Sequence, residues 1–256
     1  MKQNPSSGFT LVEIAIVLVV IGLLIAGVLK GQELVANTQA NMSVTRARAI
    51  DTAIVTFRSN FKYLPGDLNR NPAAVLPRCT SAVCTRVGDG NGQIGLEDAQ
   101  VQTATALDTE NTTAFAQLAA VNLLAGVQSD FTTLEFGVSN PSAPGSGGFR
   151  LGFTRDDIIT GMTASTLRSG HYLSLVNNLD GTITGTDNDN AALTPAQATR
   201  IDKKMDDGMP NTGSVIGQGM VHPTDVRACA LTSAANSGYA TDLKGTNCGV
   251  YIRILN

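Results

Sequence analysis

A long apolar run near the start of the chain limits its fold more than any other feature. Almost every side chain from Phe9 to Leu29 is apolar, after a polar segment that ends at Gly8. At a rise of 1.5 Å per residue, about 21 helical residues cross the roughly 30 Å of a bilayer's hydrocarbon core. An ordinary secretory signal has its small cleavage-site residues after the apolar stretch, whereas Gly8 precedes it. The run therefore predicts a membrane-spanning helix that stays attached after any cleavage at Gly8.

One carboxylate, Glu13, lies inside this run. A charged residue at the bilayer centre costs about 2.5–3.5 kcal/mol on insertion scales, so an intramembrane carboxylate is a candidate functional group. Two interpretations are open at this point. Glu13 either lies near one end of the span, where its side chain reaches the headgroups, or it pairs with a positive charge.

The letters GFTLVE at positions 8–13, followed by an apolar helix, resemble the N-terminal processing motif of type IV prepilins and type II secretion pseudopilins. The resemblance implies that prepilin peptidase cuts after Gly8 and methylates the new terminal amine of Phe9. It also implies that Glu13 pairs with the terminal amine of a neighbouring subunit during assembly. A buried charge that is tolerable only when it is paired can fix the register of that assembly.

The same resemblance implies where the chain acts and what it meets. Before assembly it would be a single-pass inner-membrane protein with a periplasmic soluble domain, held by the lipid bilayer. Its further partners would be an inner-membrane assembly platform and other pilin subunits in a helical filament. The assembled form would be an extracellular pilus or a periplasmic pseudopilus.

The rest of the composition fits one soluble domain. The sequence has 256 residues and a net charge of −3, and the part beyond the anchor, roughly 190–200 residues, has the length of one domain. There is no basic excess that would indicate nucleic-acid binding. We divide the chain into a leader (1–8), a transmembrane and filament-core segment (9–29), an amphipathic continuation of the helix (30–64) and a globular domain (65–256).

Hydrophobic periodicity predicts an α+β fold of type IV pilin-like layout. From residue 50 to 64 apolar residues recur at helical spacing, and Pro65 ends the pattern. Alternation predicts antiparallel strands at 148–154, 171–177 and 249–255, with a further candidate at 131–138. A short helix is expected at 113–124. The long N-terminal helix is therefore expected to pack on a small antiparallel sheet.

A further helix is predicted to begin at Thr194. Thr194 is a good N-cap residue, and Pro195 suits the first helical position. Three acidic residues follow on this helix, and we expect them to form a solvated face: Asp202, Asp206 and Asp207.

The chain has four cysteines, and four cysteines allow three connectivities that sequence alone does not decide. In the oxidising periplasm that the resemblance implies, we predict the local pairs Cys79–Cys84 and Cys229–Cys248. The second pair would close a loop of about 20 residues, contribute roughly 3 kcal/mol if unstrained, and resemble the cysteine-bounded C-terminal loop of many pilins. Zinc is disfavoured because neither pair has the spacing of a zinc knuckle.

The stretch GDGNGQIGLED places Asp89, Asn91 and Gln93 at alternate positions, as in the first half of a calcium-binding loop. The glycine of the sixth position is missing, and Glu97 or Asp98 would have to replace the usual twelfth-position glutamate. A turn that needs only Asx and Gly residues explains the same letters. Calcium bound by these four residues is therefore one hypothesis and an ion-free turn is the other. The acidic stretch at 187–189 has the same ambiguity.

The sequence shows no catalytic apparatus. It has two histidines and lacks a nucleophile elbow, a phosphate-binding loop and a dinucleotide-binding pattern. We therefore expect a structural protein rather than an enzyme: a pilin-like subunit that is added to a filament through its N-terminal helix. The alternative is a low-abundance minor pilin or a type II secretion pseudopilin, acting in filament initiation, ligand recognition or protein secretion. No cofactor is expected apart from the calcium hypothesis.

Overall fold

The computed structural model describes residues 10–95, 109–154, 158–159, 166–179, 190–223, 225–232 and 237–255. The chain forms two compact units, Met1–Thr38 and Gln39–Asn256. Several residues singled out by the sequence lie outside the described part: Gly8, Phe9, Glu97 and the acidic stretch at 187–189.

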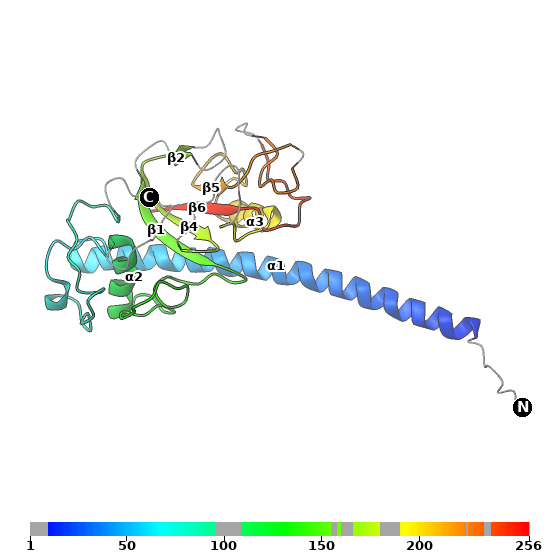
Figure 1. Cartoon of the computed structure of the whole chain (residues 1–256), viewed down its shortest axis with the longest axis horizontal. Helices are drawn as coiled ribbons and strands as arrows, with labels where there is room; N and C mark the ends of the chain where they lie inside the picture. The colour runs from blue at the N-terminus through cyan, green and yellow to red at the C-terminus, as the bar shows by residue number, and fades with distance from the viewer. Residues whose placement is uncertain are drawn as a thin grey trace, which may run out of the picture. The chain divides into compact units, whose positions relative to one another are not determined.

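Helix α1 runs without a break over Leu11–Phe61, so it begins in the first unit and ends in the second (Figure 1). The sequence predicts this continuity, but it places the end at residue 64. The helix ends earlier because Lys62 takes a left-handed φ of 67° while its N–H still donates to the carbonyl of Arg58 at 2.9 Å. A left-handed residue directly after the last helical one is a common helix C-cap.

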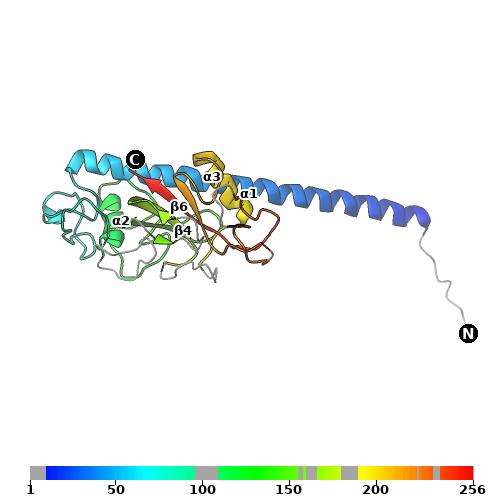
Figure 2. The same ribbon diagram turned by 90° about the horizontal axis from the view of Figure 1, so that it is seen from above.

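In the second unit, the apolar stripe of α1 forms one side of the core. Ile50, Ile54 and Phe57 are fully buried, and they belong to the same hydrophobic cluster as Phe149 and Leu173 of the sheet. Figures 1 and 2 place the sheet on one side of this part of the helix. The α+β layout, in which a long helix packs on a small antiparallel sheet, is therefore confirmed.

The sheet has four antiparallel strands in the order β1-β4-β6-β5. Leu173 in the centre lies opposite Leu151 on one side and Ile252 on the other, so all three point toward α1. Tyr172 and Tyr251 lie on the opposite face, in a small separate cluster. The strands are β1 (Gly148–Thr154), β4 (Gly170–Val176), β6 (Gly249–Ile254) and β5 (Val215–Gln218), with a separate pair β2 (Ile158–Ile159) and β3 (Thr166–Leu167).

The candidate strand at 131–138 is wrong. The carbonyl of Glu135 accepts hydrogen bonds from the N–H groups of Val138, Ser139 and Asn140, and the Ser139 hydroxyl closes the same turn through its bonds to the N–H and carbonyl of Glu135. Gly137 has a left-handed φ of 87°. Local side-chain and backbone bonds thus replace a ladder at this point.

Two further helices complete the second unit, together with a short 3-10 helix, η1 (Pro72–Ala74). Helix α2 (Glu110–Ala120) starts three residues earlier than the sequence predicts. It ends before Leu123 because Asn122 is left-handed, with a φ of 56°, and the N–H of Leu123 returns to the carbonyl of Leu118 at 3.0 Å. This is the bond pattern of a Schellman C-cap.

Helix α3 (Pro195–Met205) begins as predicted, with Thr194 as N-cap and a reciprocal bond to Gln197. It lies along α1, since the Gln197 amide donates to Gln39 at 3.2 Å and the Arg48 guanidinium donates to the carbonyl of Lys204 at 3.2 Å. α3 therefore adjoins one edge of the exposed face of α1 in the second unit.

The predicted solvated face of α3 is wrong for Asp202. Its side chain is 0% exposed, because the Tyr239 hydroxyl donates to it at 2.9 Å and the N–H of Gly208 donates to it at 3.0 Å. Asp206 is half-buried and accepts from the N–H groups of Ser214 and Val215, and only Asp207 is exposed. The prediction failed because the partners lie in distant segments.

The structure joins Cys79 to Cys84 and Cys229 to Cys248. All four residues are buried. The first disulfide lies against α2, with the Cys84 sulfur 3.9 Å from the carbonyl of Ala116. The second ties the start of β6 to residues 228–230. Backbone hydrogen bonds join this segment to Met220 and Ala240.

Candidate functional site

The described N-terminus of α1 is closed by a reciprocal bond between Thr10 and Glu13. Both the N–H and the hydroxyl of Thr10 donate to Glu13 Oε2 at 2.8 Å, and the N–H of Glu13 donates to Thr10 Oγ1 at 3.3 Å. This is a capping box, in which a Thr at the N-cap and an acidic residue at the third helical position satisfy each other's backbone groups. Glu13 therefore has a partner within its own chain.

Sequence analysis missed Thr10, although its signal is present in the letters. A Thr followed three residues later by Glu, directly ahead of an apolar run, is the signature of a capping box. The structure thus adds an interpretation of Glu13 that needs neither lipid headgroups nor a second subunit. Experiments on Glu13 have to separate capping from pairing.

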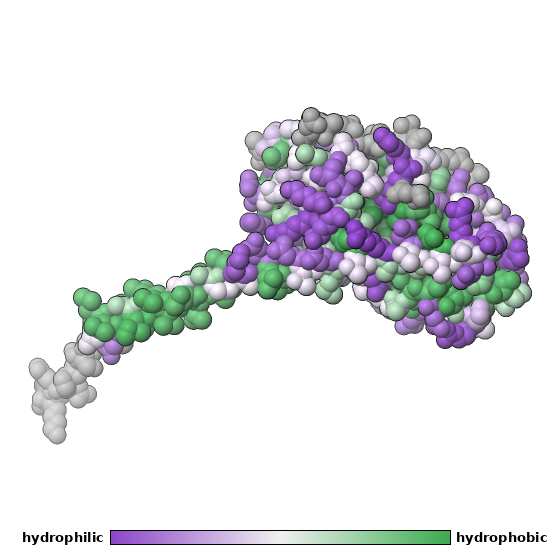
Figure 3. All heavy atoms as spheres, turned by 180° about the vertical axis from the view of Figure 1, so that it is seen from behind, coloured by the Kyte–Doolittle hydropathy of each residue, from purple (hydrophilic) through white to green (hydrophobic). Residues whose placement is uncertain are grey.

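The apolar surface of α1 in the first unit has no partner among the described residues. Every side chain from Leu11 to Leu29 is exposed, and Leu11 reaches 86%. Figure 3 shows hydrophobic side chains along the visible face of this segment. By length and composition the helix can cross a membrane. Because so large an apolar surface is not stable in water, it requires lipid or other helices around it.

In the second unit, a second surface of α1 faces outward. Its residues follow one another by three or four positions, which places them on one face of the helix. We call it the small-residue stripe: Met42, Thr45, Ala49, Thr52, Thr56 and Ser59. All are exposed except Thr56, which is half-buried. The stripe itself contains no charged residue, and the exposed Arg48 borders it between Thr45 and Thr52.

The threonine hydroxyls of the stripe are occupied within the helix itself. Thr45, Thr52 and Thr56 each donate to the carbonyl four residues earlier, at 3.0, 2.8 and 2.7 Å. With these donors satisfied, the stripe presents small side chains without charge. Small residues let helix backbones approach closely, so this surface suits packing against another helix.

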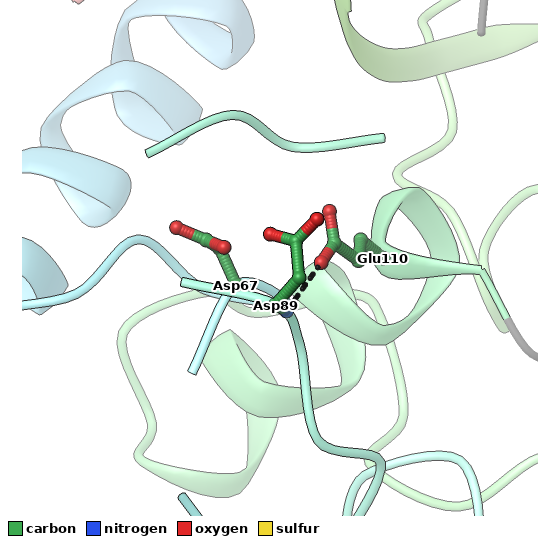
Figure 4. Close-up of side chains that lie close together, drawn as sticks. All are labelled: Asp67, Asp89 and Glu110. Carbon is green, nitrogen blue, oxygen red and sulfur yellow. Dashed lines mark hydrogen bonds between the residues drawn. The ribbon is translucent and has the colours of Figure 1, made fainter. Parts of the chain in front are cut away.

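The structure brings three carboxylates together at the loop that was considered for calcium. Oxygen atoms of Asp67, Asp89 and Glu110 lie within 4.8 Å of one another (Figure 4). Asp67 accepts from the N–H groups of Gly90 and Gly92 at 2.7 and 2.9 Å. Glu110 accepts from the N–H of Asp89 at 3.2 Å, the bond drawn in Figure 4. The carboxylates of Asp67 and Glu110 therefore shape the loop.

Burial changes the acidity of this cluster. It raises the pKa of Asp67 to about 6, and the neighbouring Asp89 adds to the rise, whereas the N–H groups of Gly92 and Gly90 lower it. Burial also raises the pKa of Glu110. Both shifts have the cause expected of carboxylates that lose water and lie beside like charge.

Three residues of the calcium hypothesis, Asp89, Asn91 and Gln93, lie in the described structure, whereas Glu97 lies outside it. Asn91 turns its amide toward Asp89, to which it donates at 2.8 Å, and uses its carbonyl oxygen to accept from the N–H of Gln93 at 2.7 Å. These are the bonds of the alternative Asx turn. Asp67 and Glu110, which sequence analysis missed, lie more than twenty positions from Asp89, so no local spacing could have indicated them.

Calcium at this loop stays a prediction. If calcium binds there, a hundredfold excess over its Kd should stabilise the folded chain by about 2.7 kcal/mol, because it binds only the folded state. The measurement is the thermal midpoint in calcium against chelator, with Asp89→Asn removing the shift and the exposed Asp242→Asn keeping it. Equal midpoints in calcium and chelator would leave the turn interpretation.

Comparison with known proteins bears on the N-terminal segment. A family model described as the prokaryotic N-terminal methylation motif matches residues 3–29. The chain carries the prepilin and pseudopilin signature. The match covers the polar segment before Gly8, Glu13 and the apolar surface of α1, and none of the second unit. No curated protein and no solved structure matches the chain at a significant level.

The signature gives the exposed surface of α1 a context. It implies processing by prepilin peptidase and assembly with pilin subunits, and with the apolar helix it fits a membrane-anchored pilin precursor. It also implies a structural rather than a catalytic protein.

Proposed function

We propose that the chain is a pilin-like structural subunit, processed at the inner membrane and assembled into a type IV pilus-type filament through α1. The observation that carries this proposal is the exposed apolar surface of Leu11–Leu29 in a chain whose residues 3–29 match the methylation motif. In this proposal residues 1–8 are the leader, 9–29 the membrane and filament-core segment, 30–64 the linking part and 65–256 the periplasmic or surface domain.

Assembly would exchange one apolar surrounding for another. The bilayer covers Leu11–Leu29 before assembly, and the helices of neighbouring subunits cover it afterwards, so the segment never meets water. The small-residue stripe supports contact further along α1, because it has no charge to desolvate. A head-to-tail contact of this kind does not close on itself and propagates as a filament.

Glu13 would change partners in this process. In the single chain its carboxylate accepts from Thr10. Cleavage after Gly8 would create a terminal ammonium on Phe9 of the next subunit, which offers a full positive charge in place of two neutral donors. Charge-assisted hydrogen bonds are roughly twice as strong as neutral ones, so the exchange favours docking once both groups leave water.

A minor pilin or pseudopilin is the second candidate, and one surface feature favours it. Val226 is 74% exposed, yet it lies between the paired Asp225 and Arg227, and its carbonyl accepts from the Asn247 amide at 3.1 Å. A single exposed apolar residue is an ordinary surface feature, so what supports this candidate is the fixed backbone beside the disulfide-bounded loop, on which a ligand contact could be built. The copy number of the chain in purified filaments distinguishes the two candidates.

The test of the proposal is the mass of the mature chain. Protein isolated from its native host should begin at Phe9 and carry one additional methyl group, because the polar segment ending at Gly8 is the leader in this proposal. Intact-mass analysis with N-terminal peptide sequencing makes the measurement. A Gly8→Leu variant, which removes the small residue before the cut, should keep the full N-terminus. A chain cut beyond residue 20 would instead indicate an ordinary signal peptide.

A further inference from the structure

Helix α3 is tied to the C-terminal arm, residues 237–248, by a buried side-chain pair. The Tyr239 hydroxyl donates to Asp202 Oδ2 at 2.9 Å. Asp202 is 0% exposed and Tyr239 is 5% exposed. The arm ends at Cys248, which is bonded to Cys229. Its other described bonds to the body of the domain include that from the N–H of Ala240 to the carbonyl of Cys229 at 2.8 Å and that from the Asn247 amide to the carbonyl of Val226 at 3.1 Å.

Asp202 lies among negative groups. Its carboxylate oxygens, and those of Asp206 and Asp207, are within 4.8 Å of one another. Asp206 is held in place by the N–H groups at the start of β5, and Asp207 by bonds from Met209 and Thr212 at 2.8 and 2.6 Å. Neither acid can turn away without losing these bonds.

No cation neutralises the group within the described residues. The ion pairs there do not include Asp202. On α3 the neighbouring Lys203 and Lys204 are exposed, and the side chain of Lys203 lies over Gly208. From α1, Arg48 donates to the carbonyl of Lys204 rather than to a carboxylate. The charged residues of the arm, Asp242 and Lys244, are exposed.

The protonation state of Asp202 therefore sets the stability of its buried contact with Tyr239. With the proton present, Asp202 is neutral and the cluster carries one charge less. Without it, a fully buried carboxylate lies beside two others, and only two hydrogen bonds compensate for the lost water.

We propose that Asp202 is a pH-sensitive latch, which in its protonated form holds Tyr239 and the C-terminal arm against α3 and on deprotonation lets the arm loosen locally. The disulfide Cys229–Cys248 confines the opening, because it keeps the end of the arm fixed to the domain. The latch would thus tune the mobility of the cysteine-bounded surface without unfolding the sheet.

The direction of the pH dependence follows from the pKa of Asp202. Burial raises the pKa of Asp202 from 3.8 to about 7, while the bonds from Tyr239 and Gly208 act in the opposite direction and Asp207 and Asp206 add to the rise. A raised carboxyl pKa means that the closed arm binds more protons than the open one. Its stability is full in acid, falls as the pH rises toward 7 and changes little above that.

Amide hydrogen exchange on the full chain in detergent micelles, with chelator present, tests the latch. After correction for intrinsic exchange, protection in peptides covering 237–247 should fall at least tenfold between pH 5 and pH 7.5, while β4 and β6 peptides keep theirs. Asp202→Asn cannot ionise and should abolish the fall. Asp242→Asn, which removes an exposed carboxylate of the same arm, should leave it unchanged.

Tyr239→Phe keeps the test decisive if Asp202→Asn does not fold. The hydroxyl bond favours the charged carboxyl, so without it the fall in arm protection should persist and move to higher pH. Three results would each overturn the latch: wild-type protection of the arm that does not change with pH, an Asp202→Asn variant that loses protection as steeply as the wild type, or a Tyr239→Phe arm whose protection does not change with pH.

Discussion

An aspartate in place of Thr52 should stop filament formation while leaving the subunit folded. Thr52 is exposed near the middle of the small-residue stripe, and Asp has nearly the same helix propensity as Thr, so the change costs the single subunit little. Its one lost side-chain bond is the 2.8 Å bond from the Thr52 hydroxyl to the carbonyl of Arg48, within the helix. The charge stays in water until a neighbouring helix covers it.

In the filament the same charge would be buried without a partner. An uncompensated buried charge costs about 3–5 kcal/mol, which corresponds to a loss of roughly two to three orders of magnitude in the docking equilibrium. Arg48, one turn earlier, is a nearby cation, and it already donates to the carbonyl of Lys204. That bond to a neutral carbonyl leaves the guanidinium charged, so Arg48 can offset part of the cost as an i,i+4 partner, and we expect a loss nearer to about two orders of magnitude than three.

Thr52→Asn is the matched control, because it has nearly the size of Asp and no charge. The measurement is the yield of shear-released filaments relative to membrane-held protein, with thermal unfolding of each purified variant as a check on folding. Asn should assemble at close to the wild-type yield and Asp should not. Filaments of the Asp variant at wild-type yield would mean that the stripe faces solvent in the assembled state.

The parts of the fold that the sequence predicts are those with a local period. The apolar run of α1 and the alternation in β1, β4 and β6 report burial residue by residue, and the structure has these elements where the pattern places them. The start of α3 was equally predictable, because a capping Thr followed by Pro acts within one turn.

Most errors occur where a segment distant in the sequence determines burial or strand pairing. Asp202 is on the side of α3 that Tyr239 covers, and Tyr239 lies thirty-seven positions later. β5 is a strand because β6 pairs with it, and with four residues it has too short a pattern to find. The segment 131–138 is a local exception, because it alternates like a strand but the adjacent Ser139 closes it into a turn.

The candidate sites divide in the same way. Glu13 was conspicuous because a carboxylate is expensive in an apolar run, and Thr10 could have been found from its spacing to Glu13 alone. Asp67 and Glu110, in contrast, reach Asp89 only through the tertiary fold. Single-sequence reasoning therefore found the N-terminal site and only one member of the carboxylate cluster.

Replacing Glu13 should separate its three possible roles. If the carboxylate only reaches the headgroups, Glu13→Val makes the anchor more apolar and leaves assembly intact, because insertion scales favour valine over an acidic residue by roughly 3 kcal/mol. If it pairs with a neighbouring ammonium, Glu13→Val subunits should insert, be cut after Gly8 and accumulate in the inner membrane. They should not enter filaments, because breaking a buried pair costs about 3–5 kcal/mol.

Glu13→Gln decides between pairing and capping. Glutamine at the third helical position can still close a capping box with Thr10, so a purely capping role predicts wild-type assembly for this variant. It would also predict that Thr10→Val, which removes the cap hydroxyl, costs as much as any change at Glu13, or about 0.5–2 kcal/mol.

Pairing predicts the reverse order: Glu13→Gln lowers filament yield by two to three orders of magnitude, in line with the roughly tenfold change per 1.4 kcal/mol, and Thr10→Val lowers it far less. Both variants retain the apolar run, but Thr10 lies two positions after Gly8, so intact mass must first show that each variant is cut after Gly8. The ratio of shear-released to membrane-held protein among processed chains then measures the docking step. Undiminished incorporation of Glu13→Gln in cells without the wild-type chain would assign Glu13 to the helix cap.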